Sequence, residues 1–129
     1  MRARRRNTGP GVKTRLIVLN RDRWACARCG RPAGPATGTY SIQHRKARGV
    51  GGGNSLCNLL LLCGSATTGC HGEVEARQDP HDQLAGYRLE SWQDPAAEGV
   101  MYFSESGSGF TAWLLEDGTL SFEAPEAVA

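Results

Sequence analysis

The chain has 129 residues, including 17 glycines, six prolines and five cysteines, and carries a formal net charge of +2. This length favours one domain, or a small domain with an extension, and the many turn-forming residues indicate a modest core. No apolar run has the length of a secretory leader or of a membrane span. We therefore expect a cytoplasmic protein without membrane association, whose cysteines bind metal rather than form disulfides.

Charge is divided unevenly along the chain. Residues 1–50 contain 13 Lys and Arg and one acid, whereas residues 51–129 contain two Arg and 12 acids. Such segregation indicates that the first half meets a polyanion. A solvated basic tail is the alternative, but basic residues also flank the motifs described below, which favours nucleic acid.

Short helices and strands are predicted after a basic, loop-rich arm at residues 1–13. Thr14 is a suitable N-cap for the first helix, although the β-branched pair Ile17–Val18 leaves a strand open as the alternative. The predicted order up to residue 80 is a helix at 14–24, a strand at 39–44, a glycine-rich loop at 48–54, a strand at 56–63 and a helix at 70–78.

The C-terminal part has a different pattern. Residues 81–92 predict a helix with Leu84, Tyr87 or Arg88, and Trp92 near one face, which ends before Pro95. Three short strands are then predicted, at 100–103, 110–115 and 119–122. We therefore divide the chain into the basic arm 1–13, a domain at 14–80 and an extension at 81–129.

The cysteines predict a structural zinc site. Cys26 and Cys29 form a CxxC pair, which supplies two ligands from one tight turn, and zinc needs two more to complete a tetrahedron. Cys63 and Cys70 are the best second pair, because the small residues between them can fold back. Cys57 lies within an apolar run, and we expect it to be a buried free thiol.

Five short motifs follow one another in the chain: Cys26–Cys29, Ile42-Gln43-His44-Arg45, Gly51-Gly52, Asn58-Leu59-Leu60-Leu61-Leu62-Cys63 and Cys70-His71. In this order they make the stretch Tyr40–His71 resemble the HNH nuclease family, and the likeness covers about residues 12–78. It is most similar to small HNH proteins of bacteriophages. The resemblance implies an α+β fold: a ββα-metal (HNH) core with a structural zinc knuckle, followed by a C-terminal helix and short strands.

The resemblance also implies roles for individual residues. His44 would be the general base that activates water, since a neutral imidazole is a usable base near neutral pH. Asn58 would hold the loop after His44, because an amide donates and accepts at once. His71 would bind a catalytic divalent cation, which is Mg²⁺, Mn²⁺, Ni²⁺ or Zn²⁺. His71 as a fourth ligand of the structural zinc is the alternative.

Gln43 departs from the family pattern, in which the residue before the base is usually an acid or a histidine that binds the catalytic metal. A glutamine carbonyl is a weaker ligand for a hard cation than a carboxylate. Three alternatives follow: Gln43 is a poor ligand, Glu75 replaces it from the helical turn after His71, or catalysis is weakened or lost.

Together these features predict a metal-dependent endonuclease acting on double-stranded DNA. Arg45, Lys46 and Arg48 follow the predicted base and would contact flanking phosphates. The likeness to phage proteins implies a place in DNA processing or packaging, with packaging proteins such as terminase as partners and the host cytoplasm as location. The alternative is a zinc-stabilised DNA-binding or adaptor module. A third reading makes residues 81–129 a protein-interaction element.

Overall fold

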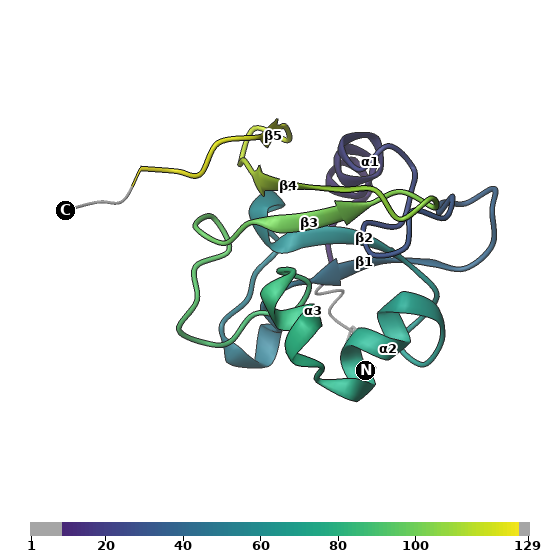
Figure 1. The fold of residues 1–129 in the computed structure, drawn as a ribbon, viewed down its shortest axis with the longest axis horizontal. Helices are drawn as coiled ribbons and strands as arrows, with labels where there is room; N and C mark the ends of the chain where they lie inside the picture. Colours follow the sequence, from purple (N-terminus) through teal and green to yellow (C-terminus); the bar gives the residue numbers. More distant parts are fainter. Residues whose placement is uncertain (1–8, 127–129) are drawn as a thin grey trace, which may run out of the picture.

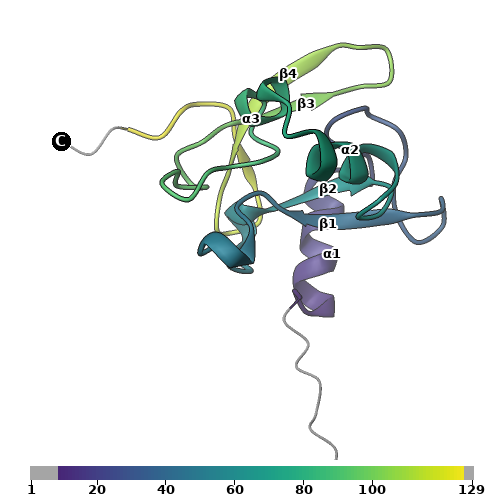
Figure 2. The same cartoon turned by 90° about the horizontal axis from the view of Figure 1, so that it is seen from below.

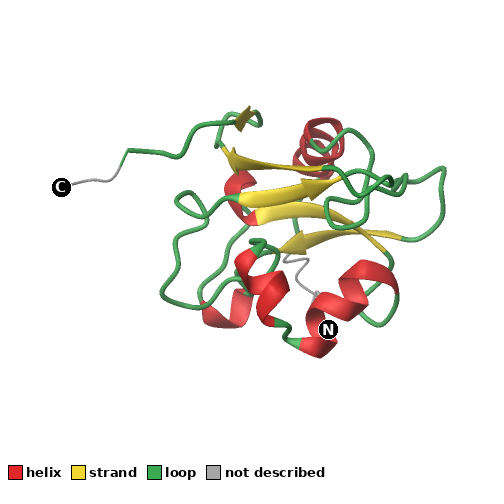
Figure 3. Cartoon of the chain, viewed as in Figure 1, coloured by secondary structure: helices red, strands yellow, loops and turns green. Residues whose placement is uncertain are grey.

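The computed structural model describes residues 9–126, which form a mixed α+β structure with three α-helices and two small sheets (Figures 1 and 3). The predicted α+β class is therefore confirmed. Residues 1–8 of the predicted basic arm, with Arg2, Arg4, Arg5 and Arg6, lie outside the described residues. Within residues 9–126, none of the helices combines the length and the apolarity that crossing a membrane requires.

The elements follow one another in an order close to the prediction. Their bounds are α1 Val12–Arg21, β1 Tyr40–His44, η1 Arg48–Val50, η2 Leu56–Asn58, β2 Leu59–Cys63, α2 Gly69–Arg77, α3 Pro80–Leu84, β3 Val100–Phe103, β4 Gly109–Leu114 and β5 Leu120–Ser121.

The N-terminal segment is helical, so the strand alternative for Ile17–Val18 does not hold. α1 buries Val18 and Leu19 against β2. The helix ends where Arg23 and Trp24 take positive φ angles of 58° and 53°. Two consecutive left-handed residues reverse the chain and lead it directly into the CxxC segment.

β1 and β2 form an antiparallel hairpin in which Gln43 pairs with Leu60 and His44 with Leu59. The hairpin lies between α1 on one side and α2 on the other (Figure 2). All five residues of β2 are buried, because helices cover both faces of the strand. Its sequence is accordingly apolar throughout rather than alternating. The order strand, strand, helix therefore places the predicted site residues around one small hairpin.

β3, β4 and β5 form a second antiparallel sheet, close to the predicted strand positions. The extension shares one hydrophobic core with the rest of the chain, because Val100 and Leu114 belong to the same buried cluster as Val18 and Leu61. The CxxC segment bridges the two sheets: the Ala27 amide donates to Leu61 O at 3.0 Å, and the Phe103 amide donates to Ala27 O at 2.8 Å.

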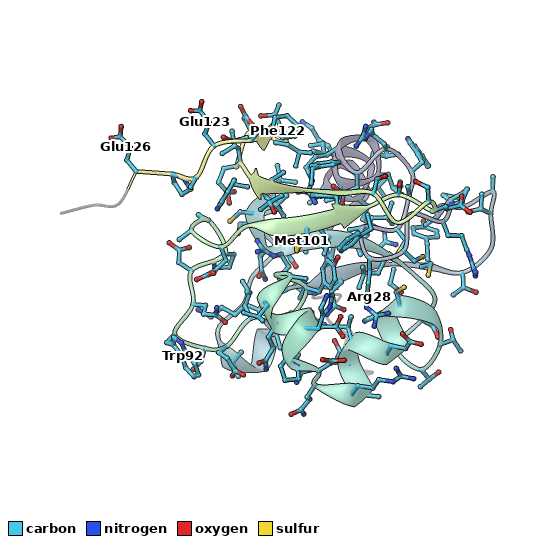
Figure 4. All side chains as sticks on the ribbon, in the orientation of Figure 1. Arg28, Trp92, Met101, Phe122, Glu123 and Glu126 are labelled. Carbon is cyan, nitrogen blue, oxygen red and sulfur yellow. The ribbon has the colours of Figure 1, made fainter. Side chains whose placement is uncertain are left out.

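The predicted helix at 81–92 is wrong beyond its first turn. α3 ends at Leu84, and Gly86 turns the chain with a φ of +85°. Tyr87 is fully buried, whereas the side chains of Leu84 and Trp92 are 87% and 79% exposed, so these three residues do not share a face. Trp92 lies in the loop at the edge of the molecule (Figure 4).

Arg45 is buried inside the fold, with 1% of its surface exposed. Burial lowers the pKa of its guanidinium to about 10, so the group stays charged at neutral pH. Main-chain carbonyl oxygens surround the charge in place of a carboxylate. The guanidinium donates at 2.7–2.9 Å to the carbonyl oxygens of Cys57, Gly86, Pro95 and Glu98. Arg45 therefore connects the end of β1 to the C-terminal extension.

We expect Arg45→Met to lower the free energy of unfolding by about 3 kcal/mol or more. Each buried carbonyl left without a donor costs roughly 1–3 kcal/mol, and methionine cannot donate to any of them. Urea denaturation followed by circular dichroism measures the change. Arg48→Met, at an exposed position, is the control and should shift stability by about 0.5 kcal/mol or less. Equal losses in the two variants would contradict the structural role of Arg45.

Candidate functional site

Four cysteines converge from three separate parts of the chain. Their Sγ atoms all lie within 4.8 Å of one another, and Cys29 Sγ is 3.8 Å from Cys63 Sγ. A tetrahedral zinc ion with Zn–S bonds of about 2.3 Å separates its sulfurs by about 3.8 Å. The cluster can therefore hold a metal ion such as zinc. Its members are Cys26 and Cys29 after α1, Cys63 at the end of β2 and Cys70 in the first turn of α2.

Thiolate character in the cluster is supported by its surroundings. The hydrogen bond from the Cys26 thiol, together with a smaller effect of Arg28, lowers the pKa of Cys70 to about 5. The same hydrogen bond, together with burial, raises the pKa of Cys26. A thiolate is the form that binds zinc.

Arg28 lies between the two knuckle cysteines and projects toward α2 and α3 (Figure 4). It donates to Glu73 Oε2 at 2.5 Å and to Asp82 Oδ1 at 2.9 Å, so it joins the cysteine cluster to both helices. No feature of the sequence singled out Arg28. Its position within CxxC was visible, but its partners lie 45 and 54 residues away.

Two further expectations about the cluster can be compared with the structure. Cys57 is a buried free thiol outside the group of four, as predicted. His71 does not belong to that group either, because four cysteines already complete a tetrahedron. The alternative of His71 as a zinc ligand is therefore not supported.

A small pocket of about 150 Å³ lies at the end of β1. Three segments line it: the end of β1 with the loop up to residue 50, the C-terminal end of α2, and residues 88–90 of the extension. It brings Gln43 and His44 together with Glu75. An imidazole, an amide and a carboxylate thus line one cavity, although the segment 88–90 was not part of the predicted site.

The imidazole of His44 is oriented by Asn54, a residue of the glycine-rich loop that sequence reasoning missed. His44 Nε2 lies 2.7 Å from Asn54 Oδ1. A carbonyl oxygen can only accept, so this contact places the ring proton on Nε2 and leaves the lone pair on Nδ1. A histidine with a free Nδ1 lone pair can take a proton from water.

Asn58 holds both ends of the loop that follows His44. Its Oδ1 accepts from the Lys46 amide at 2.8 Å, and its Nδ2 donates to the carbonyl oxygens of Lys46 and Gly53 at 3.0 and 2.9 Å. The side chain is 1% exposed, so these contacts are protected from water. The predicted loop contact is present, while a part for Asn58 in catalysis stays a prediction.

His71 lies on α2 one turn before Glu75, and its Nε2 is 3.8 Å from Glu75 Oε1. Its Nδ1 atom is buried and has no hydrogen-bond partner among the described residues. Burial lowers the pKa of the imidazole, which favours the neutral form that binds metal. That this pair binds a cation, with Glu75 in place of Gln43, stays a prediction. Gln43 is 2% exposed and lines the pocket at His44 together with Glu75, whereas His71 is not among the lining residues.

The predicted phosphate contacts separate into two groups. The prediction is wrong for Arg45, because its guanidinium is enclosed and its donors bind main-chain carbonyls. Lys46 is partly buried and Arg48 is exposed on the loop. These two side chains remain candidates for contact with DNA.

Two larger hollows, of about 460 and 650 Å³, lie beside α1 and β4. Asp22, which lines the first, is already engaged by Arg21, by the Leu61 amide and by the Tyr102 hydroxyl. Neither hollow contains a histidine. We therefore place the candidate chemistry in the smaller pocket at His44.

We expect the purified protein to contain one zinc ion per chain and Cys70→Ser to lose it. Metal binding in small sites of this kind supplies roughly 10–16 kcal/mol of apparent folding energy, so the variant should also lose its folded structure. Metal analysis and circular dichroism measure the two effects. Cys57→Ser, which alters a cysteine outside the cluster, should retain the metal. Full zinc content in Cys70→Ser would contradict the assignment.

Comparison with known proteins found no relative of this chain. No protein-family model matches the chain, and no curated protein and no solved structure is similar to it.

Proposed function

We propose that this protein is a metal-dependent endonuclease that hydrolyses phosphodiester bonds of DNA, with His44 as general base. The observation that carries the proposal is the pocket at the end of β1, where His44 lies beside Gln43 and Glu75. The resemblance of Tyr40–His71 to the HNH family supports the same assignment. The basic first half of the chain suits a polyanionic substrate. By the same resemblance, DNA processing or packaging in a bacteriophage is the proposed setting, with double-stranded DNA and packaging proteins as partners.

His44 would carry the proton transfer. With Nε2 protonated and bound to Asn54 Oδ1, Nδ1 accepts a proton from water. The water oxygen forms a bond to phosphorus, and the bond from phosphorus to the leaving oxygen breaks. Asn58 keeps the loop after His44 in place during this step.

His71 and Glu75 would hold the catalytic cation, with the Gln43 carbonyl as a further weak oxygen ligand. Nε2 of His71 lies 3.8 Å from Glu75 Oε1, so this ring nitrogen and the carboxylate are the pair that would share such an ion. When bound, the cation supplies charge stabilisation at the phosphate and the leaving oxygen.

A zinc-stabilised DNA-binding module is the second candidate. It is favoured by the neutral side chain at Gln43. It is also favoured because, among the described residues, the four cysteines are the only group of three or more His, Cys, Asp or Glu placed to hold a metal. Such a module would bind DNA without cutting it.

We expect the wild-type protein to cleave plasmid DNA with Mg²⁺, Mn²⁺ or Ni²⁺, and His44→Ala to be slower by about 10²–10⁴-fold. This is the usual contribution of a positioned general base. Gel analysis of plasmid nicking measures the rates. His81→Ala, on the exposed start of α3, is the matched histidine control and should cleave like wild type. Equal nicking by wild type and His44→Ala would remove the basis of the proposal, and retained DNA binding would then favour the second candidate.

We expect Gln43→Asp to increase cleavage at limiting Mg²⁺, because a carboxylate binds a hard cation more strongly than an amide. Titrating Mg²⁺ in the plasmid assay measures the shift in the metal concentration needed for half-maximal rate. Gln43→Asn changes the length of the side chain without adding charge and serves as the control. An unchanged metal requirement in Gln43→Asp would show that this position does not face the cation.

A further inference from the structure

Arg88 is a charged residue of the pocket at His44 and belongs to none of the motifs that resemble the HNH family. Two arginines line this cavity, Arg45 and Arg88. The guanidinium of Arg45 is enclosed and bound to main-chain carbonyls. The side chain of Arg88 is 30% exposed, so its charged end can reach a ligand in the cavity.

The backbone around Arg88 is fixed to the strand that carries His44. The Leu89 amide donates to Arg45 O at 2.7 Å, and Lys46 and Leu89 form a parallel bridge. Arg45 Nε also donates to Gly86 O at 2.7 Å. The residues on both sides of Arg88 are thereby held next to the residues that follow His44. This fixes the position of Arg88 relative to His44.

The guanidinium of Arg88 has weak contacts in this structure. It lies 3.5 Å from Val74 O and 3.3 Å from Glu75 O, and 3.8 Å from Glu75 Oε2. A guanidinium has five donors arranged in a planar fork, and carboxylate or phosphate groups satisfy that fork with two parallel hydrogen bonds. Long contacts to the end of α2 leave Arg88 able to exchange them for shorter ones to an anion.

Two carboxylates line the pocket together with Arg88, and their negative charge opposes that of its guanidinium. Glu75 is the candidate metal ligand described above. Glu90 Oε1 accepts from Gln83 Nε2 at 3.0 Å, which directs that carboxylate toward α3. An anionic ligand entering the pocket therefore needs a cation beside these acids, and Arg88 is placed to provide one.

We propose that Arg88 binds the phosphodiester that His44 attacks through water, an inference that rests on the proposed nuclease function. Its guanidinium contacts the non-bridging oxygens of the phosphate. As the water oxygen bonds to phosphorus and the leaving oxygen departs, negative charge grows on these oxygens, and a fixed cation stabilises it. Arg88 takes no part in the proton transfer, because His44 takes the proton from water.

Arg88→Gln is the decisive variant, because glutamine can still donate to the carbonyl oxygens at the end of α2 but has no charge. Hydrolysis of bis(p-nitrophenyl) phosphate reports on the pocket alone, because this small diester has no flanking phosphates that other basic residues could bind. We expect turnover to fall by about 10²-fold or more in Arg88→Gln and to recover partly in Arg88→Lys. Arg77→Gln, at the exposed end of α2, is the matched control and should stay within about two-fold of wild type.

Binding of a short DNA duplex in Ca²⁺, measured at several salt concentrations, gives a second readout. Loss of one phosphate contact should reduce the slope of log K against log salt by about 0.9 in Arg88→Gln, whereas a structural defect alone would leave the slope unchanged. Wild-type turnover and salt slope in Arg88→Gln, with His44→Ala inactive, would overturn the inference and leave the proposed function intact. If the wild type cleaves no faster than His44→Ala, the proposed function fails, and the salt slope alone then decides whether Arg88 binds phosphate.

Discussion

The convergence of four thiols is the constraint on which the rest of the structure depends. Cys26 and Cys29 follow α1, Cys63 ends β2 and Cys70 begins α2, so one small cluster fixes the starts and ends of three elements. Burying four cysteines side by side is favourable when a metal ion replaces their protons. With a limited core and many glycines, this chain would gain from a bound metal the order that a larger protein obtains from packing alone.

A second constraint is the buried guanidinium of Arg45. A charge removed from water needs compensation, and here main-chain carbonyls from both halves of the chain provide it. The extension is therefore held against the end of β1 by a residue adjacent to His44. As a result the pocket has a wall, residues 88–90, that comes from outside the stretch resembling a known family.

Most of the fold could be predicted from local patterns, and the failures have physical causes. The α+β class, the strands and α2 follow from apolar periodicity and turn residues. The helix predicted at 81–92 stops early because Gly86 takes a positive φ and Tyr87 is drawn into the core. Helical periodicity cannot reveal this, since tertiary burial overrides local propensity.

The sequence by itself determined the candidate residues: the four cysteines through residue type and spacing, and His44, Asn58 and His71 through the resemblance of their motifs. Only the tertiary structure decided what surrounds them. It turned Arg45 inward, placed Asn54 against His44, and brought Glu75 and Arg88 into one pocket. Metal-ligand spacing is encoded locally, because a knuckle is a single turn. The direction of an arginine side chain depends instead on which carbonyls lie nearby, and residues up to 54 positions away in the chain supply them.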